Sequence, residues 1–408
     1  MRRHSISAVI CAVILLTALC GSPSAADYDF HAGVYTSYEY TDNYQGTAHD
    51  RESENIYEIG PSAQILISTS TMRLDLSGHA AQSFHRNFDD DDFTNILLNS
   101  RFETSTQRDT FSLVYGFTQN NQRSTLDEVS GESRIHSGTM NYTRALTPAS
   151  TVGLGYTYNQ EVYHYPNDDV VSHGVNGSVS HRLTPRDTVR VTGGYDLHYY
   201  EYQGDTWVGR TGLSYNSLVT EKTTLGVNGE YQHQGRIDQP DGDITSVFLT
   251  MGYSLAGQTH VNLSGGYNWL STEDADRESS YAIQGELTHA SQNDTLSLIV
   301  SKEYTAEFET GRYGIYDTQR VSASWRRSLK QDLFFLTTVS YDIRDPVSTN
   351  ESATLSGEDR NFTGMISLNW QPLEYVTFTA SYTRLEQILE ISDTVRENRY
   401  RLRAEVRY

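Results

Sequence analysis

Cysteine and lysine are almost absent from this chain of 408 residues. Both cysteines, Cys11 and Cys20, precede residue 27, so the rest of the chain has no disulfide framework, no thiol nucleophile and no cysteine-based metal site. No apolar run after residue 20 approaches the ~18 residues that a membrane-spanning helix needs. The formal net charge of −21 and the pI of about 4.9 argue against bare nucleic acid as a partner.

Aromatic residues, in contrast, are plentiful. Only 37% of the residues are hydrophobic and the mean hydropathy is −0.55, yet aromatics reach 11% and tyrosine alone contributes 29 residues. Disordered chains are poor in aromatics, so this composition predicts an ordered protein in spite of its polarity.

The first 26 residues have the order of an export signal. Arg2 and Arg3 precede an apolar stretch from Ile6 to Leu19, and the small residues at 24–26 follow before Asp27. The stretch is too short for a membrane anchor and is wrongly flanked for one. We therefore expect a signal peptide at 1–26 and a mature chain at 27–408.

Short alternating runs of apolar and polar residues recur through the whole mature chain. A period of two over ten or so residues predicts strands with one apolar and one polar face. The threonines that open six of these runs are spaced 35 to 41 residues apart, which fits a repeated hairpin with one tight turn and one longer loop; they are Thr110, Thr151, Thr188, Thr223, Thr259 and Thr295.

The connections alternate between nine short turns and ten long loops, which implies twenty strands, with eighteen as the alternative. Among the long connections we expect 234–243, 305–316 and 343–360. Nearly all of the net negative charge falls in the long connections. A soluble propeller or β-helix has no reason to sort charge in this way, whereas a barrel in the outer membrane of a Gram-negative bacterium does. We therefore predict an all-β, transmembrane, antiparallel up-and-down β-barrel of about 18–20 strands.

The last strand supports this prediction, because residues 400–408 alternate strictly and stop on the aromatic Tyr408. This ending looks like the C-terminal signal by which bacterial outer-membrane barrels are recognised for insertion. We expect outer-membrane lipid and lipopolysaccharide as the surroundings of the barrel.

A barrel of this size is too wide for side chains to fill, so we expect an aqueous lumen unless loops plug it. Two interpretations of its charged lining stay open: salt bridges that stiffen the wall, or a solute path in which acidic and basic groups orient a polar ligand. His198 and Tyr200 are also expected to point inward. The charged candidates are Asp75, Arg190, Asp196, Glu230, Glu286, Glu303, Arg320, Arg326, Arg401, Arg403, Glu405 and Arg407.

Other site chemistry is weak in this sequence. The run Asp89, Asp90, Asp91 and Asp92 is a weak calcium candidate, because it lacks the spaced order of a dedicated calcium loop. Divalent bridging to lipopolysaccharide and plain solvated charge are the alternatives. The sequence contains no Gly-x-Ser-x-Gly elbow and no His-Glu-x-x-His motif, so we expect no enzyme, no cofactor and no dedicated metal site.

The start of the mature chain has a recognisable pattern. A first strand ending at Asp42 and Asn43, an acidic loop, and a strand opening with Gly60 and Pro61 resemble a family of β-barrel porins often encoded with exopolysaccharide and exosortase loci. The resemblance implies an outer-membrane barrel that takes part in exporting or assembling a secreted polysaccharide. It also implies a periplasmic export protein as a separate partner, because this chain has no tetratricopeptide-type module.

Three functions therefore remain open: a pore component for exopolysaccharide export, a general diffusion porin for small polar solutes, and a structural or adhesive barrel without an open lumen. A diffusion porin would fold a long loop inward, and 343–360 is the expected candidate. If the lumen is open, the acidic loops predict cation-selective conductance.

Overall fold

The structure is a computed structural model that describes residues 26–408 except 89–90, 123–130, 164–168, 202–203, 237–238, 256, 273–277, 310–311, 349–357 and 390–393. The expected signal peptide lies outside the described residues, apart from residue 26. None of the described residues forms a helix long and apolar enough to cross a membrane.

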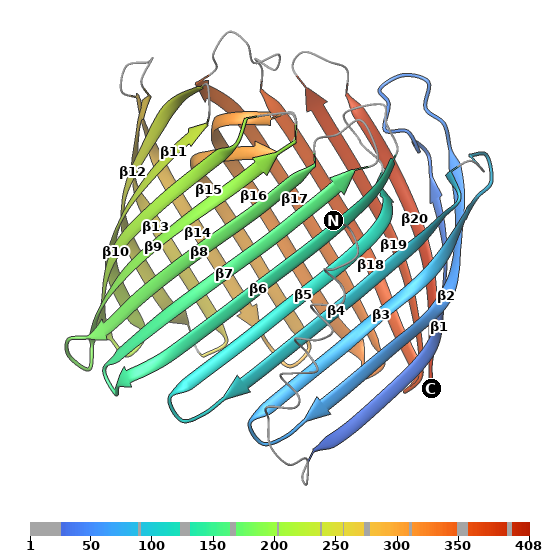
Figure 1. The fold of residues 1–408 in the computed structure, drawn as a ribbon, viewed down its shortest axis with the longest axis horizontal. Coiled ribbons are helices and arrows are strands. Elements are labelled where there is room, and N and C mark those ends of the chain that lie inside the picture. Colours follow the sequence, from blue (N-terminus) through green and yellow to red (C-terminus); the bar gives the residue numbers. More distant parts are fainter. Residues whose placement is uncertain are drawn as a thin grey trace.

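Twenty antiparallel strands form one closed barrel, as the alternation predicted (Figure 1). Each strand pairs with its neighbours in sequence, and β1 pairs with β20 to close the sheet. The strands are β1 (Asp27–Thr41), β2 (Glu54–Ser68), β3 (Met72–His85), β4 (Phe93–Ser105), β5 (Asp109–Gln122), β6 (Gly131–Thr147), β7 (Ser150–Tyr163), β8 (Val170–Arg182), β9 (Asp187–Tyr200), β10 (Thr206–Thr220), β11 (Thr223–Arg236), β12 (Gln239–Leu255), β13 (Thr259–Thr272), β14 (Glu278–Ala290), β15 (Asp294–Glu309), β16 (Arg312–Lys330), β17 (Leu333–Ser348), β18 (Asp359–Leu373), β19 (Val376–Leu389) and β20 (Val395–Arg407).

The short turns gather at one rim of the barrel and the long connections at the other (Figure 1). The expected threonine starts agree with the observed strand starts to within one residue. The start of β1 and the end of β20 share the short-turn rim, where Ala32 and Tyr408 exchange backbone hydrogen bonds of 2.9 and 2.6 Å.

Several strands run further than the sequence indicated. The expected connections 234–243 and 305–316 are largely strand, because β11 and β15 continue to Arg236 and Glu309 and the next strands begin at Gln239 and Arg312. In 343–360, β17 continues to Ser348 and residues 349–357 lie outside the described residues. The described residues near these strand ends include a buried apolar cluster of Ile244, Leu270 and Ile315, against which Tyr304 and Val347 pack. The sequence-based prediction was therefore wrong about the lengths of the connections at 234–243 and 305–316.

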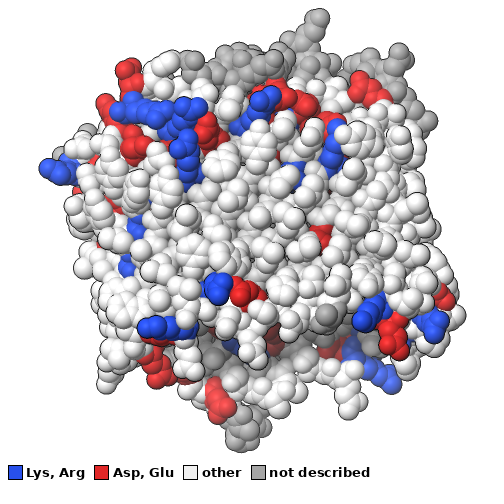
Figure 2. Space-filling model, turned by 180° about the vertical axis from the view of Figure 1, so that it is seen from behind, with Lys and Arg blue, Asp and Glu red and all other residues white. Residues whose placement is uncertain are grey.

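Apolar side chains cover the outer face of the barrel. Charged residues lie mostly toward the two rims, with a largely uncharged band between them (Figure 2). On β18 the outward-facing Ile366, Leu368 and Trp370 are exposed, and the next outward charge along the strand is Arg360. The ten residue steps from Arg360 to Trp370 span about 34 Å along the strand, or about 26 Å across a barrel whose strands tilt by ~40°. That height matches the ~25 Å apolar band of outer-membrane barrels.

Aspartates near the short turns form hydrogen bonds with aromatic side chains at the border of this band that lies toward the short-turn rim. Each aspartate stands at or next to the start of a strand and accepts a hydrogen bond from an aromatic residue of the following strand. The pairs are Tyr142 to Asp109 (2.6 Å), Tyr215 to Asp187 (2.8 Å), Trp325 to Asp294 (3.0 Å) and Trp370 to Asp332 (3.1 Å). The turn chemistry therefore holds aromatic rings at the depth where a membrane interface favours them.

Gly60 and Pro61 lie in the middle of β2, not at its start, which corrects the sequence-based expectation. The β1–β2 ladder runs through them without a break, whereas the β2–β3 ladder is interrupted between Ile59 and Ser62. A Cβ on Gly60 would lie 1.8 Å from the backbone oxygen of Ala80. Glycine allows this close approach of β2 to β3, and proline is tolerated where a ladder hydrogen bond is absent.

Candidate functional site in the lumen wall

The structure places the sequence-predicted charged residues on the inner face of the barrel. On β9, Arg190 and Asp196 alternate with the exposed outer residues Val191 and Tyr195, and the other candidates follow the same parity in their own strands. His198 and Tyr200 share the inner face of β9. The strand register fixes the orientation of these two side chains. That they contact a transported solute stays a prediction.

The inner charges do not form one site. Asp196 pairs with Arg210 of β10, a residue that the sequence analysis missed. Elsewhere the contacts are local: Gln284 donates to Glu303, Asn262 donates to Glu286, and the Arg326 guanidinium lies 4.3 Å from the centre of the Phe334 ring. These contacts fit the interpretation that many inner charges stiffen the wall.

One region is different, because four strands around the closure bring charged groups together. Its centre is the Glu58 carboxylate of β2, which accepts hydrogen bonds from the Tyr35 hydroxyl, from Ser37 at 2.6 Å and from Asn95 at 2.7 Å. Arg401 of β20 donates to the same carboxylate at 2.9 Å. Both Glu58 oxygens therefore have hydrogen-bond partners in the wall.

Arg401 also donates to the Tyr35 hydroxyl at 2.8 Å, a contact between residues 366 positions apart in sequence. Tyr35 is only 2% exposed, and its ring packs 5.1 Å from that of His79. The guanidinium of Arg403 lies 4.5 Å from the centre of the same ring. The first and last strands are therefore joined on the inner face by a charged and aromatic network.

Further along β20, toward the short-turn rim, Glu405 lies between two arginines. It accepts from Arg407 at 2.7 Å and from Arg403 at 3.1 Å. Toward the opposite rim, Arg399 donates to Glu397 at 2.7 Å, and Glu397 also accepts from Thr41 at 2.7 Å. β20 thus presents arginines to the lumen at positions 399, 401, 403 and 407. We call this set the arginine ladder.

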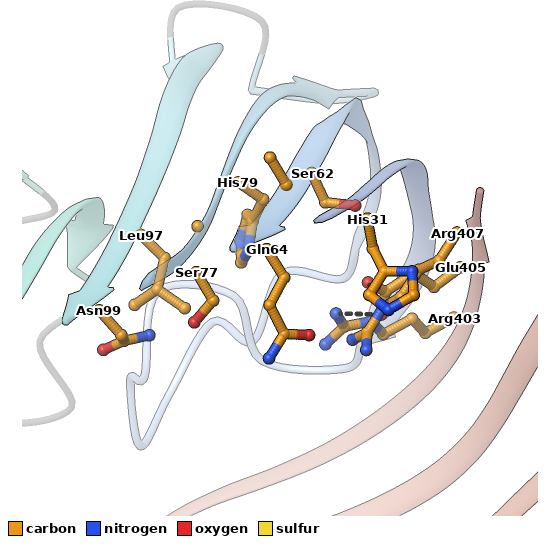
Figure 3. A pocket seen from close by; sticks show the side chains of 12 residues that line it. His31, Ser62, Gln64, Ser77, His79, Leu97, Asn99, Arg403, Glu405 and Arg407 are labelled. Atoms are coloured by element: carbon orange, nitrogen blue, oxygen red, sulfur yellow. Dashed lines mark hydrogen bonds and ion pairs between the residues drawn. The ribbon is translucent and has the colours of Figure 1, made fainter. Parts of the chain in front are cut away.

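Two hollows in the wall lie along this ladder. The larger, of about 420 Å³, is lined by Arg399 and Arg401 together with Asn95 and His79. The smaller, of about 170 Å³, is bordered by Arg403, Glu405 and Arg407. Figure 3 shows these three residues on one side of the smaller hollow, with Gln64 and Ser77 facing them and Asn99 beyond.

Sequence analysis found Arg401, Arg403, Glu405 and Arg407 but missed their partners. Tyr35 was assigned no inner position, although it has the parity opposite to the outward-facing Val34. Glu58 likewise has the parity opposite to the exposed Tyr57 and Ile59 of β2. The parity of the strand was the signal that would have placed both residues inside.

The four motif residues of the resemblance do not line these hollows. Asp42 and Asn43 lie at the long-loop end of β1 and bond to β20, whereas Gly60 and Pro61 allow the close approach of β2 to β3. Asn43 is fully buried. These four residues therefore have structural roles in pairing β1 with β20 and β2 with β3.

Part of the acidic run also has structural partners. Asp91 accepts from the Tyr44 hydroxyl at 3.0 Å, and Asp92 accepts from the backbone amide of His85 at 2.6 Å. Asp89 and Asp90 lie outside the described residues. Within the described part of the chain, no group of three or more His, Cys, Asp or Glu side chains is arranged to hold a metal ion.

No family model matches this chain, and no curated protein matches it in sequence. Solved structures do resemble it. The FrpB iron transporter from Neisseria meningitidis has a TM-score of 0.60 at 8% identity, over 93% of this chain and 83% of that chain. A mutant of the ferric enterobactin receptor PfeA from Pseudomonas aeruginosa has a TM-score of 0.51 at 9% identity, over 94% of this chain and 81% of that chain. At these identities the likeness establishes a shared fold, the closed antiparallel β-barrel of outer-membrane proteins.

Proposed function

We propose that this chain is an outer-membrane channel for a secreted exopolysaccharide. The observation that carries the proposal is the contrast between the two faces of one closed barrel. The outer face carries an apolar band about 26 Å high, which fits a bilayer. The inner face carries hydrogen-bonding groups around hollows large enough to seat part of a polar solute.

The chemistry of the hollows favours a saccharide over an apolar solute. Guanidinium, amide and hydroxyl groups line them, and such groups bond to the hydroxyls and ring oxygens of sugars. The resemblance at the start of the mature chain supplies the more specific idea of exopolysaccharide export. A periplasmic export protein would meet the barrel at its short-turn rim, where the start of β1 and the end of β20 lie together.

A general diffusion porin is the second candidate, and one observation favours it. Val114 and Ile299 are apolar residues on the inner face, and both are exposed. The side chains of these two residues are therefore not covered by other parts of the described chain, as expected for a lumen that is open and filled with water. The expected constriction loop does not decide the question, because residues 349–357 lie outside the described residues.

Two measurements on the same protein separate these functions. In cells, deletion of the gene should leave the polymer inside the envelope, and the full chain supplied in trans should restore secretion. In liposomes, the purified protein should admit sugars, measured by swelling. Normal secretion after deletion, combined with rapid entry of disaccharides, would overturn the export function in favour of a diffusion porin. Normal secretion and no swelling would indicate a structural barrel.

A further inference from the structure

The geometry points to an acidic saccharide as the ligand of the arginine ladder, bound through its carboxylate groups. The inference deepens the proposed function and rests on it. It names the chemical class of the polymer and the part of the wall that contacts it.

The first step of the argument is the difference in exposure between the two signs of charge. The Arg401 side chain is 41% exposed and its partner Glu58 only 14%. Arg407 is 52% exposed, whereas Glu405 is 10% exposed. These two carboxylates thus lie against the wall, and their guanidiniums project from it, so the surface that a solute meets at these pairs is basic. Glu39 is a further carboxylate in the lining of the larger hollow.

The second step is hydrogen-bonding capacity. Each guanidinium has five N–H donors and no acceptor. The Glu58 oxygens are taken by Tyr35, Ser37, Asn95 and Arg401, so this carboxylate has little capacity left for a ligand. A surface rich in donors and poor in available acceptors selects ligands that carry acceptors, and carboxylates match the guanidinium fork best.

The third step concerns spacing. Successive inward positions on a strand are about 6.8 Å apart, and the ladder occupies three of them in a row before Glu405 and Arg407. Across the smaller hollow from Arg403 and Arg407 stand the neutral groups of Gln64, Ser77 and Asn99. A chain of sugars with repeated carboxylates offers charges to the ladder and hydroxyls to these neutral groups. A single small anion would use only one position.

The test uses the purified full-length protein in planar bilayers. The probes are tetragalacturonate and maltotetraose, an acidic and a neutral oligosaccharide of equal length. We expect tetragalacturonate to interrupt the ion current at concentrations about tenfold lower than maltotetraose, because charge-assisted hydrogen bonds are stronger than neutral ones.

The variant Arg403→Gln/Arg407→Gln should lose about tenfold in the affinity of this block, while Arg403→Lys/Arg407→Lys should retain part of it. The matched control is Arg101→Gln, a lumen-facing arginine of β4 that pairs with Glu103 and lies outside the ladder. Heat-modifiable gel migration shows whether each variant is folded. If Arg403→Gln/Arg407→Gln does not fold, Arg407→Gln alone provides the comparison.

Three results would overturn the inference: equal block by both sugars, equal loss of block in the Arg101→Gln control, or no block in an open channel. None of these removes the proposed function, which the secretion assay tests separately. An absence of any channel activity together with normal secretion would instead remove the proposed function itself.

Discussion

The side-chain amide of Asn43 donates a hydrogen bond of 2.8 Å to the backbone carbonyl of Arg396, across the seam where the first and last strands meet. The same amide nitrogen donates to the Thr47 carbonyl at 2.8 Å, and the amide oxygen accepts from the Thr47 backbone at 3.1 Å. Next to it, Asp42 accepts from the backbone and side chain of Asn398 at 2.7 and 2.6 Å. Two adjacent residues therefore fasten the long-loop end of the seam.

Replacing Asn43 with alanine should weaken the closed barrel. The change leaves buried backbone groups without partners, which costs about 1–3 kcal/mol. We expect the folded band in a gel to convert to the unfolded band at a lower temperature than in the wild type. Asn293→Ala, at an exposed turn position between β14 and β15, is the control and should behave like the wild type. Equal conversion temperatures for all three proteins would contradict this role of Asn43.

Gly60→Ala should prevent normal assembly, because its Cβ would overlap the backbone of Ala80 and backbone cannot move aside cheaply. We expect little or no heat-modifiable protein in the outer-membrane fraction. Gly229→Ala is the matched control within β11, since nothing lies within 4 Å of a Cβ built there. Normal amounts of folded Gly60→Ala would show that β2 and β3 separate more easily than the structure indicates.

Substitution of Tyr408 should affect assembly more than stability. Its backbone exchanges two hydrogen bonds with Ala32, but its side chain is 98% exposed and packs against nothing in the barrel. We expect Tyr408→Asp to lower the amount of assembled protein, whereas the molecules that do assemble should unfold at the wild-type temperature. Deletion of the residue should also remove the backbone bonds and lower that temperature. Wild-type amounts of Tyr408→Asp in the outer membrane would contradict a C-terminal recognition signal.

An open channel should prefer cations at low salt, because the net negative charge lies in and beside the long connections at one rim. Screening limits the reach of these charges to ~8 Å at physiological ionic strength, so the preference should fade toward ~1 M salt. The measurement is the reversal potential across a salt gradient. Anion selectivity at low salt would mean that the arginines of β20 outweigh the acidic rim.

The acidic run at 89–92 allows a sharper version of this test. Two of its residues also have structural contacts, because Asp91 accepts from the Tyr44 hydroxyl and Asp92 accepts from the backbone amide of His85. Asparagine keeps an acceptor oxygen for both contacts and alanine does not. The four-Asn variant should therefore lose cation preference and stay folded, whereas the four-Ala variant should also unfold at a lower temperature. Equal stability of the two would assign no structural part to these aspartates.

Strand number and orientation were predictable because they depend on local patterns. A closed barrel turns one face of each strand to lipid and the other to the lumen, so the parity that exposes Leu402 also places Arg401 and Arg403 inside. Strand lengths were less predictable. The backbone ladder continues beyond the alternating pattern, as where Glu309 still pairs with Arg312, so the pattern alone did not show where each strand ends.

The central network of the lumen wall was not predictable in the same way. Tyr35, Glu58 and Arg401 come together only because β1 pairs with both β2 and β20, and no local pattern states which residue of the last strand faces which residue of the first. Tyrosine adds a second difficulty, because it suits the membrane interface as well as a buried network. Twenty-nine tyrosines offered many equally good candidates.

The row of aspartate-held aromatics at one rim has a consequence for hydrophobic mismatch. Trp370 is tied to Asp332 and cannot sink into the hydrocarbon without breaking that bond, while Arg360 marks the opposite border on the same strand. The height of the apolar band is therefore fixed by the positions of Trp370 and Arg360 on β18. A bilayer thicker than about 26 Å must thin around the protein, because tilting a closed barrel would draw charged residues of one side into lipid.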